Sequence, residues 1–257
     1  MGTAMRRAII LLMLALAGGL LAACAGKGQT AHTTARTTGS PGAGTTAAST
    51  GTSLSQGQAR AYARAVNLTS ADVPGFTAST QRPQRSASEA RLEHAMLRCA
   101  GSAGSESALA EVGSKDFELK RGVLNLSVSS EVTVAHSAAA ALRTLASIRD
   151  AHVRECFSRF LDTLIKGENL NGASVGPVSI QSGNPPAPGT AGGFGWRVTV
   201  PLTVHQLGVS FYLDILGFVD GPAEVTLSST GLVQPFPAAV EQQLFKLLLA
   251  RAKAHAA

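Results

Sequence analysis

The sequence predicts an α+β domain, with an antiparallel sheet of about five strands and amphipathic helices packed on one face of it. Residues 124–134 alternate between apolar and polar side chains, which is typical of a strand with one buried and one solvent-facing side. Strand and helix patterns do not take turns along the chain, and this order favours an antiparallel sheet over a parallel one. The other strand candidates are residues 174–181, 196–205, 209–219 and 223–230.

Two helices are expected before the first strand. Residues 55–66 follow a helical pattern and lead into a turn-rich connection, NLTSADVPGF. Ser86 and Glu89 then have the spacing of a capping box, in which each side chain satisfies a free backbone N–H at the start of a helix. This second helix is expected to run to about Cys99.

The middle of the chain predicts two further helices. Residues 101–114 are rich in Gly and Ser, and predict no more than one helical turn, near Leu109. Beyond the first strand, residues 137–148 and 150–166 follow helical patterns, and the second of them carries a clear apolar stripe. Gly167 is suited to end that helix.

The C-terminal part combines the remaining strands with one last helix. A loop rich in Pro and Gly, GNPPAPGTAGG, separates the strand candidates 174–181 and 196–205. Pro201 predicts that its strand lies at an edge or carries a bulge, because proline has no N–H to donate. The last helix follows Pro237 and runs to about Lys253, with the acidic Glu241 near its start, as the helix dipole favours.

Charge distribution argues against a nucleic-acid partner. The 257 residues carry a formal net charge of +6, from 22 Lys and Arg against 16 Asp and Glu. Four of the basic residues precede residue 59, so the remainder of the chain has 18 basic against 16 acidic groups. No basic run with interleaved aromatic residues occurs, and such a run is the usual mark of nucleic-acid binding.

The first 23 residues predict a secretory signal peptide. Arg6 and Arg7 precede an apolar segment that ends in small residues, and no charge follows until Lys27. The apolar segment is marginal for a transmembrane helix, which needs about 20 apolar residues.

The end of this leader resembles the lipobox of bacterial lipoproteins. Leu21, Ala22, Ala23 and Cys24 match the pattern of a leucine, two small residues and a cysteine. The resemblance implies cleavage before Cys24 and a lipid on its thiol, which would hold the protein on the outer face of the cytoplasmic membrane. The alternative is an ordinary signal peptide cut near Ala23 or Ala25, with an unmodified cysteine.

Residues 24–58 are expected to form the lipidated cysteine and a disordered tether. Between residues 25 and 58, 26 of 34 residues are Ala, Gly, Ser or Thr, and such a segment cannot bury enough apolar surface to offset its ordering entropy. Residues 59–257 then form one globular domain.

Two cysteines remain for the folded domain, Cys99 and Cys156. In an exported protein, an even number of cysteines left in the folded domain predicts a disulfide, which here would join two helices. The alternative is a pair of buried free thiols. No CxxC or HExxH motif indicates a redox or metal site, and no cofactor is expected.

The domain resembles actinobacterial envelope lipoproteins of the LpqN type and the extracellular sensor domains of mycobacterial receptor kinases. The residues that carry the resemblance are FYLDILGFVDGPAEVTLSS, PFPAAVEQQL and the two helix cysteines, and it covers about residues 55–255. It implies an exported domain that binds or senses an envelope component.

One motif suggests an enzyme. Residues 172–176 match GxSxG, which places the serine nucleophile of α/β-hydrolases on a turn between a strand and a helix. Here Ser174 precedes a strand pattern, so the better interpretation is a glycine-rich turn entering a strand.

A weak candidate ligand face comprises Trp196, Arg197, Tyr212 and Asp214. Trp196 could stack on a ligand, although sealing one end of the core is the more common role for a single tryptophan. The others would share a polar sheet face, for which plain solvation is the default interpretation. The histidines considered as metal ligands show no metal-binding spacing; these are His94, His136, His152 and His205.

The sequence therefore predicts a non-enzymatic lipoprotein that binds or senses an unknown envelope ligand or protein. One alternative is a carrier that holds acyl chains between sheet and helices. The other is an envelope hydrolase that uses Ser174.

Overall fold

The computed structural model describes residues 54–79, 87–101, 108–122, 124–167, 174–204 and 206–255. The predicted leader, the lipobox and the tether up to residue 53 lie outside the described residues, and so do Ser86 and His205.

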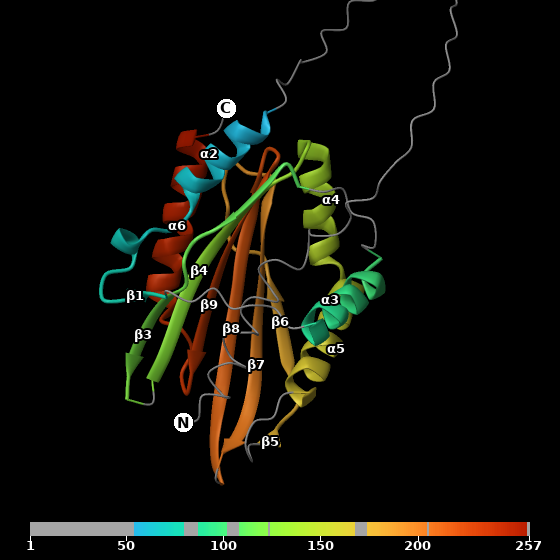
Figure 1. The fold of residues 1–257 in the computed structure, drawn as a ribbon, viewed down its shortest axis with the longest axis vertical. Coiled ribbons are helices and arrows are strands. Elements are labelled where there is room, and N and C mark those ends of the chain that lie inside the picture. Colours follow the sequence, from blue (N-terminus) through green and yellow to red (C-terminus); the bar gives the residue numbers. More distant parts are fainter. Residues whose placement is uncertain are drawn as a thin grey trace, which may run out of the picture.

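An antiparallel sheet of nine strands organises the described residues (Figure 1). Its strand order is β1-β3-β4-β9-β8-β7-β5, while β2 also pairs with β4 and β6 with β7. The long strands are β4 (Leu124–Val134), β7 (Gly192–Val204), β8 (Leu207–Asp220) and β9 (Ala223–Leu232). The short strands are β1 (Thr77–Ala78), β2 (Ala110–Gly113), β3 (Phe117–Arg121), β5 (Ser174–Val175) and β6 (Ser179–Gly183). The α+β class and the antiparallel sheet are thus confirmed, but the sheet has more strands than the five expected.

The additional strands before β4 are short and lie along one edge of it. β3 pairs with the first half of β4 and β2 with the second half, while β1 pairs with β3. The helical turn expected near Leu109 is wrong, because the backbone N–H of Leu109 donates to the carbonyl of Val134 at 2.8 Å and extends the β2 pairing. Strands of two to five residues show too little alternation to be recognised in a sequence.

The strand candidate 174–181 is divided into β5 and β6, which both pair with β7. Val175 lies opposite Leu202 and Ser179 lies opposite Thr199, so the β5–β6 side has one residue more than β7 over this interval. The extra residue forms a bulge beside Pro201, whose missing N–H cannot complete the ladder. Pro201 predicted that its own strand lies at an edge or carries a bulge, and this is wrong: β7 is paired on both sides, and the extra residue belongs to the β5–β6 side.

Helices cover both faces of the sheet, and the expectation of a single covered face is wrong. The helices are α2 (Gln56–Val66), α3 (Ala87–Cys99), α4 (Ala138–Arg149), α5 (Ala151–Gly167) and α6 (Ala238–His255), with a short 3₁₀ helix, η1, at Ser70–Asp72. α3, α4 and α5 pack on one face, whereas α2 and α6 pack on the other (Figure 1).

Strand β8 explains why both faces need cover. Its residues Phe211, Leu213 and Ile215 belong to the core beneath α4 and α5, whereas Phe218 belongs to the core beneath α2 and α6. Successive side chains of a strand point to opposite faces of the sheet. A strand with apolar side chains on both faces therefore needs helices packed on each face to bury them.

The folded part begins before residue 59. Ser55 caps α2, and its hydroxyl accepts a hydrogen bond from the backbone N–H of Gln58, whose side chain accepts one from the backbone N–H of Ser55. Leu54 packs against the core beneath α2 and α6. The domain therefore includes the last residues that the sequence assigned to the tether.

A disulfide joins Cys99 and Cys156, as predicted. Cys99 is the last residue of α3 and Cys156 lies within α5, and their Cα atoms are 5.8 Å apart. The bridge fastens α3 to α5, whose Phe157 packs against Trp196 of the sheet.

Candidate functional site

A hollow of about 320 Å³ lies on the α6 side of the sheet, between the start of α6 and the loop that follows β6. Strand β6 and the loop after it contribute polar residues, while β7 and β8 contribute an ion pair and one leucine. The residues that shape the hollow are Gln181, Ser182, Asn184, Arg197, Asp214 and Glu241.

Close contact between the loop and β7 forms one wall of the hollow. A Cβ atom on Gly193 would lie 2.4 Å from the carbonyl oxygen of Pro185, a distance that only glycine permits. The Pro- and Gly-rich composition of the loop, which predicted only a connection, thus allows it to lie directly on the strand.

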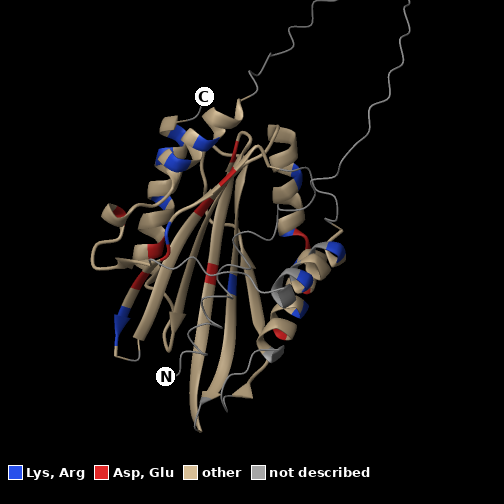
Figure 2. Cartoon of the chain, viewed as in Figure 1, with Lys and Arg blue, Asp and Glu red and all other residues tan. Residues whose placement is uncertain are grey.

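Arg197 and Asp214 form the floor of the hollow. The two residues are direct cross-strand neighbours on β7 and β8, and the guanidinium binds the carboxylate at two points, with Nε–Oδ1 at 2.6 Å and Nη2–Oδ2 at 2.9 Å. The Asp214 side chain is only 4% exposed, whereas that of Arg197 is 45% exposed. Figure 2 shows many of the charged residues on the helices. Arg197 and Asp214 instead lie near the middle of β7 and β8, away from the ends of these strands.

The pair leaves binding capacity on Arg197. Its hydrogen bonds to Asp214 raise the pKa of the guanidinium, although burial lowers it, so the group stays charged. An arginine side chain has five N–H groups, and the two bonds to Asp214 leave three of them for a ligand or for solvent.

Glu241 adds a second carboxyl group from the first turn of α6. It is 5% exposed and accepts a hydrogen bond from the Ser229 hydroxyl, and Ser229 lies opposite Asp214 in the sheet. Burial and, to a smaller extent, Asp214 raise the pKa of Glu241, while Ser229 and Arg197 lower it, and the net shift is upward. Arg197, Asp214, Ser229 and Glu241 therefore form a continuous row of polar groups from β7 to α6.

Sequence reasoning missed Ser229 and Glu241 as site residues. From the sequence, Glu241 was identified only as an acidic residue near the start of the last helix. A better signal was its spacing, because it shares the buried face of α6 with Leu244 and Leu248. A carboxyl group on an apolar helix face needs a polar partner in the fold.

The structure separates the four residues of the predicted ligand face. Arg197 and Asp214 meet, and Tyr212 lies on the same face two residues along β8. Trp196 points to the other face, where its ring packs against that of Phe157 at a centroid distance of 4.9 Å and is 6% exposed. Trp196 therefore belongs to the core, and its side chain cannot stack on a ligand in the hollow.

Ser174 lies apart from this hollow, in the two-residue strand β5. It is exposed and pairs with Thr203, and the chain continues through the bulge into β6 instead of into a helix. The strand–turn–helix context that positions a hydrolase nucleophile is thus not formed after Ser174.

The described histidines are dispersed. His94 is exposed on α3, and His136 precedes α4. His152 lies beside the disulfide, where it places a ring nitrogen within 4.8 Å of both sulfur atoms, which are bonded to each other.

No family model matches the chain, and no curated protein matches it. In the parts of the chain that the structure describes, no helix is long and apolar enough to cross a membrane. The resemblance to envelope lipoproteins and kinase sensor domains stays a prediction from the sequence.

Proposed function

We propose that the protein is an exported, lipid-anchored binding module that takes a small polar ligand in the hollow beside Arg197. Export and anchoring are supported by the leader and by the lipobox residues that end at Cys24. The tether that follows is long enough to hold the domain away from the lipid headgroups.

The ion pair at the floor of the hollow carries the binding proposal. A buried carboxylate is costly, and replacing a buried ion pair by apolar residues is often neutral or stabilising. The Arg197–Asp214 pair is thus better suited to recognition than to stability, since it holds a half-exposed guanidinium rigidly at the edge of a hollow.

The lining indicates the chemical class of the ligand. The Ser182 hydroxyl is engaged on the other face, where it accepts a hydrogen bond from Arg154 of α5. Gln181 and Asn184 offer uncharged donors and acceptors, and the charges of Arg197 and Asp214 offset each other. A compact ligand rich in hydroxyl or amide groups fits this set, and the volume lies near the lower end of ligand-binding pockets. An acyl chain would leave these polar groups unpaired, so the lining favours a polar ligand over the lipid of the carrier alternative.

Binding is favoured over catalysis at this site because its groups restrain one another. Arg197 holds both oxygens of Asp214, whose side chain is almost fully buried, so this carboxylate is poorly placed to take a proton from a bound molecule. Glu241 is occupied by Ser229.

The test is native mass spectrometry of the full chain purified from its own cell envelope. We expect a bound small molecule on the wild type and on Arg121→Gln, an exposed control at the end of β3. Arg197→Gln should lose most of it, since it removes the charged donor at the floor. Equal occupancy on Arg197→Gln, or no bound molecule on any of the three proteins, would contradict the proposal.

A further inference from the structure

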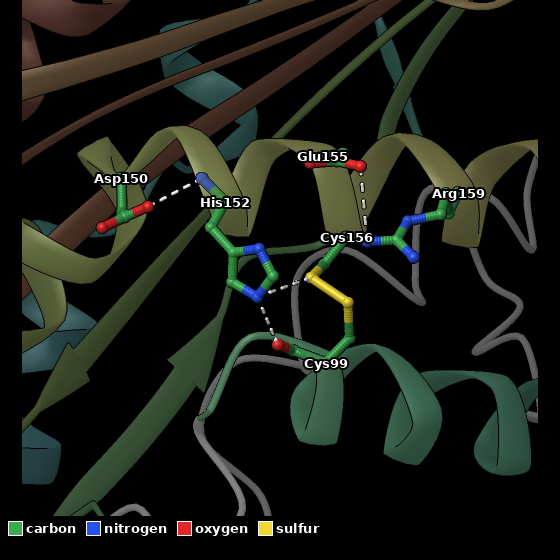
Figure 3. Close-up of a disulfide and its surroundings, with 6 residues drawn as sticks. All are labelled: Cys99, Asp150, His152, Glu155, Cys156 and Arg159. Atoms are coloured by element: carbon green, nitrogen blue, oxygen red, sulfur yellow. Dashed lines mark hydrogen bonds and ion pairs between the residues drawn. A yellow bond between two sulfur atoms is a disulfide. The ribbon is translucent and has the colours of Figure 1, made fainter.

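The disulfide has a histidine partner on the same helix (Figure 3). His152 lies one turn before Cys156 on α5, and its Nε2 atom is 3.7 Å from the Cys156 Sγ atom. The same Nε2 atom lies 2.9 Å from the carbonyl oxygen of Cys99, the other end of the bridge. A hydrogen bond of 2.7 Å from the backbone N–H of His152 to Asp150 Oδ1 holds this part of α5.

These contacts determine where the imidazole proton lies. A carbonyl oxygen can only accept, so the Nε2 atom of His152 must carry the hydrogen that joins it to Cys99. Cys156 Sγ lies 3.7 Å from the same nitrogen, within reach of a hydrogen bond shared between the carbonyl oxygen and the sulfur. A disulfide sulfur is a weak acceptor, but a thiolate at the same position would be a strong one.

The two sulfur-bearing residues differ in accessibility. Cys156 is only 2% exposed, whereas Cys99, at the end of α3, is partly exposed. An external thiolate can thus approach Cys99 Sγ more easily than Cys156 Sγ. Attack there makes Cys156 the leaving group, and Cys156 is the sulfur that faces the His152 N–H.

We propose that Cys99–Cys156 is a site of thiol–disulfide exchange, opened by an external dithiol at Cys99 and assisted by His152. The thiolate of the dithiol attacks Cys99 Sγ, the S–S bond breaks, and its electron pair leaves on Cys156 Sγ, where the His152 N–H stabilises it. The second thiol of the dithiol then attacks the mixed disulfide and releases the Cys99 thiolate. The dithiol is oxidised to a disulfide, and the protein gains two thiols once both thiolates take protons from water.

Opening the bridge would change the attachment of one helix. α3 packs mainly against α5, and the disulfide is the covalent link between them. Its Met96 and Leu92 side chains cover the core beneath α4 and α5. Reduction would therefore loosen the cover of this core while leaving the sheet and the hollow beside Arg197 in place.

The experiment compares opening rates of the oxidised full chain under native conditions. The probes are dithiothreitol, as a small dithiol, and thioredoxin, as a dithiol oxidoreductase, with new thiols counted by alkylation and mass spectrometry. His152→Ala should open about tenfold more slowly than the wild type, because the leaving thiolate loses its hydrogen bond. His94→Ala, an exposed histidine on α3, is the matched control and should open at the wild-type rate.

A second measurement separates this role from a merely structural one. With glutathione as a monothiol, the trapped mixed disulfide should lie on Cys99 and leave Cys156 free to be alkylated. If thioredoxin opens the bridge faster than dithiothreitol at equal thiol concentration, the source of the dithiol is an oxidoreductase. If dithiothreitol is faster, the source is a small thiol. Equal rates for wild type and His152→Ala, a mixed disulfide on Cys156, or opening only as fast as global unfolding would overturn the proposal. None of these outcomes depends on whether the hollow binds a ligand.

Discussion

Arg251, near the end of α6, holds Asp72 of the 3₁₀ helix in a two-point ion pair, with Nη2–Oδ1 at 2.7 Å and Nη1–Oδ2 at 2.9 Å. Nη1 also donates to the carbonyl of Asn67, where the chain leaves α2. This arginine therefore fixes the N-terminal segment of the domain to its C-terminal helix.

Arg251→Ala should lower the free energy of unfolding by about 1–3 kcal/mol at neutral pH, because it leaves the nearly buried Asp72 without its charged partner. Urea denaturation measures this loss. Lys253→Ala, an exposed change on the same helix, is the control and should differ from wild type by less than about 0.5 kcal/mol.

The same pair has a defined acid dependence. Burial raises the pKa of Asp72, but hydrogen bonds from Arg251 and Thr69 outweigh it, and the net pKa lies below the usual 3.8. A depressed pKa stabilises the fold above about pH 3.8 and ceases to do so as the pH falls through the folded value. The difference between wild type and Arg251→Ala should therefore shrink in acid, and a constant difference down to pH 2 would contradict this account.

Because of Glu224 on β9, we expect the fold to lose stability as the pH rises. Burial raises the pKa of this carboxyl to about 7 despite a hydrogen bond from Thr226, and among the described residues its Oε2 atom has no hydrogen-bond partner. Because the folded pKa exceeds the ordinary 4.5, this group makes the fold less stable as the pH rises from about 4.5 to 7. Glu224→Gln removes the titration and should stabilise the protein at pH 8 by up to about 3 kcal/mol, with little effect near pH 4.

Urea midpoints at pH 4.5 and 8 measure this effect. Glu155→Gln on the exposed side of α5 is the control and should follow the wild type at both values. An equal shift at both values for Glu224→Gln would show that packing, not ionisation, causes the change.

We expect the replacement of Val233 by glycine to stabilise the fold. It follows β9 with a φ of +79°, a region unfavourable for a β-branched side chain, and its N–H is held by the carbonyl of Ser210 at 2.9 Å. The side chain is 44% exposed, so little packing depends on it. Val233→Gly should raise the free energy of unfolding by about 0.5–1 kcal/mol.

Val240 is the control, because the same replacement by glycine should destabilise the fold there. It is 37% exposed but lies in α6, where the backbone is helical. Val240→Gly should lower stability by about 0.5–1 kcal/mol in the same thermal or urea assay. Destabilisation by both substitutions would show that the conformation at Val233 carries no strain.

If Cys24 carries the lipid, its replacement should change the location of the protein in the cell. Cys24→Ser should move most of the protein from the membrane fraction to the soluble fraction or the medium, or leave an unprocessed precursor, because only a thiol can take the lipid. Cell fractionation and immunoblotting measure this. The double substitution Cys99→Ser with Cys156→Ser should stay in the membrane fraction, while retention of Cys24→Ser there would count against lipidation.

Prediction from sequence succeeded where periodicity extends over many residues. β4 and the helices α4, α5 and α6 were expected close to their observed bounds, because ten or more residues of regular pattern outweigh local exceptions. β2 and β3 escaped notice because four or five residues, some of them exposed, carry almost no pattern. Their strand conformation depends on the hydrogen bonds that β4 offers.

The candidate site was predicted only in part. Arg197 and Asp214 were singled out as polar residues of neighbouring strands, and the register of β7 and β8 does bring them opposite each other. Trp196 was grouped with them as their neighbour in sequence, yet alternation along the strand sends it to the opposite face.

The sequence by itself determined the local patterns of this chain: its long helices and strands, the pairing of its two domain cysteines, and the expectation of export and anchoring. Only the tertiary structure decided that helices cover both faces of the sheet and that Glu241 and Ser229 meet the ion pair of Arg197 and Asp214. It also placed His152 beside the disulfide. Local patterns depend on neighbours in the chain, whereas these contacts depend on strand register and helix packing, which bring together residues that no sequence spacing relates.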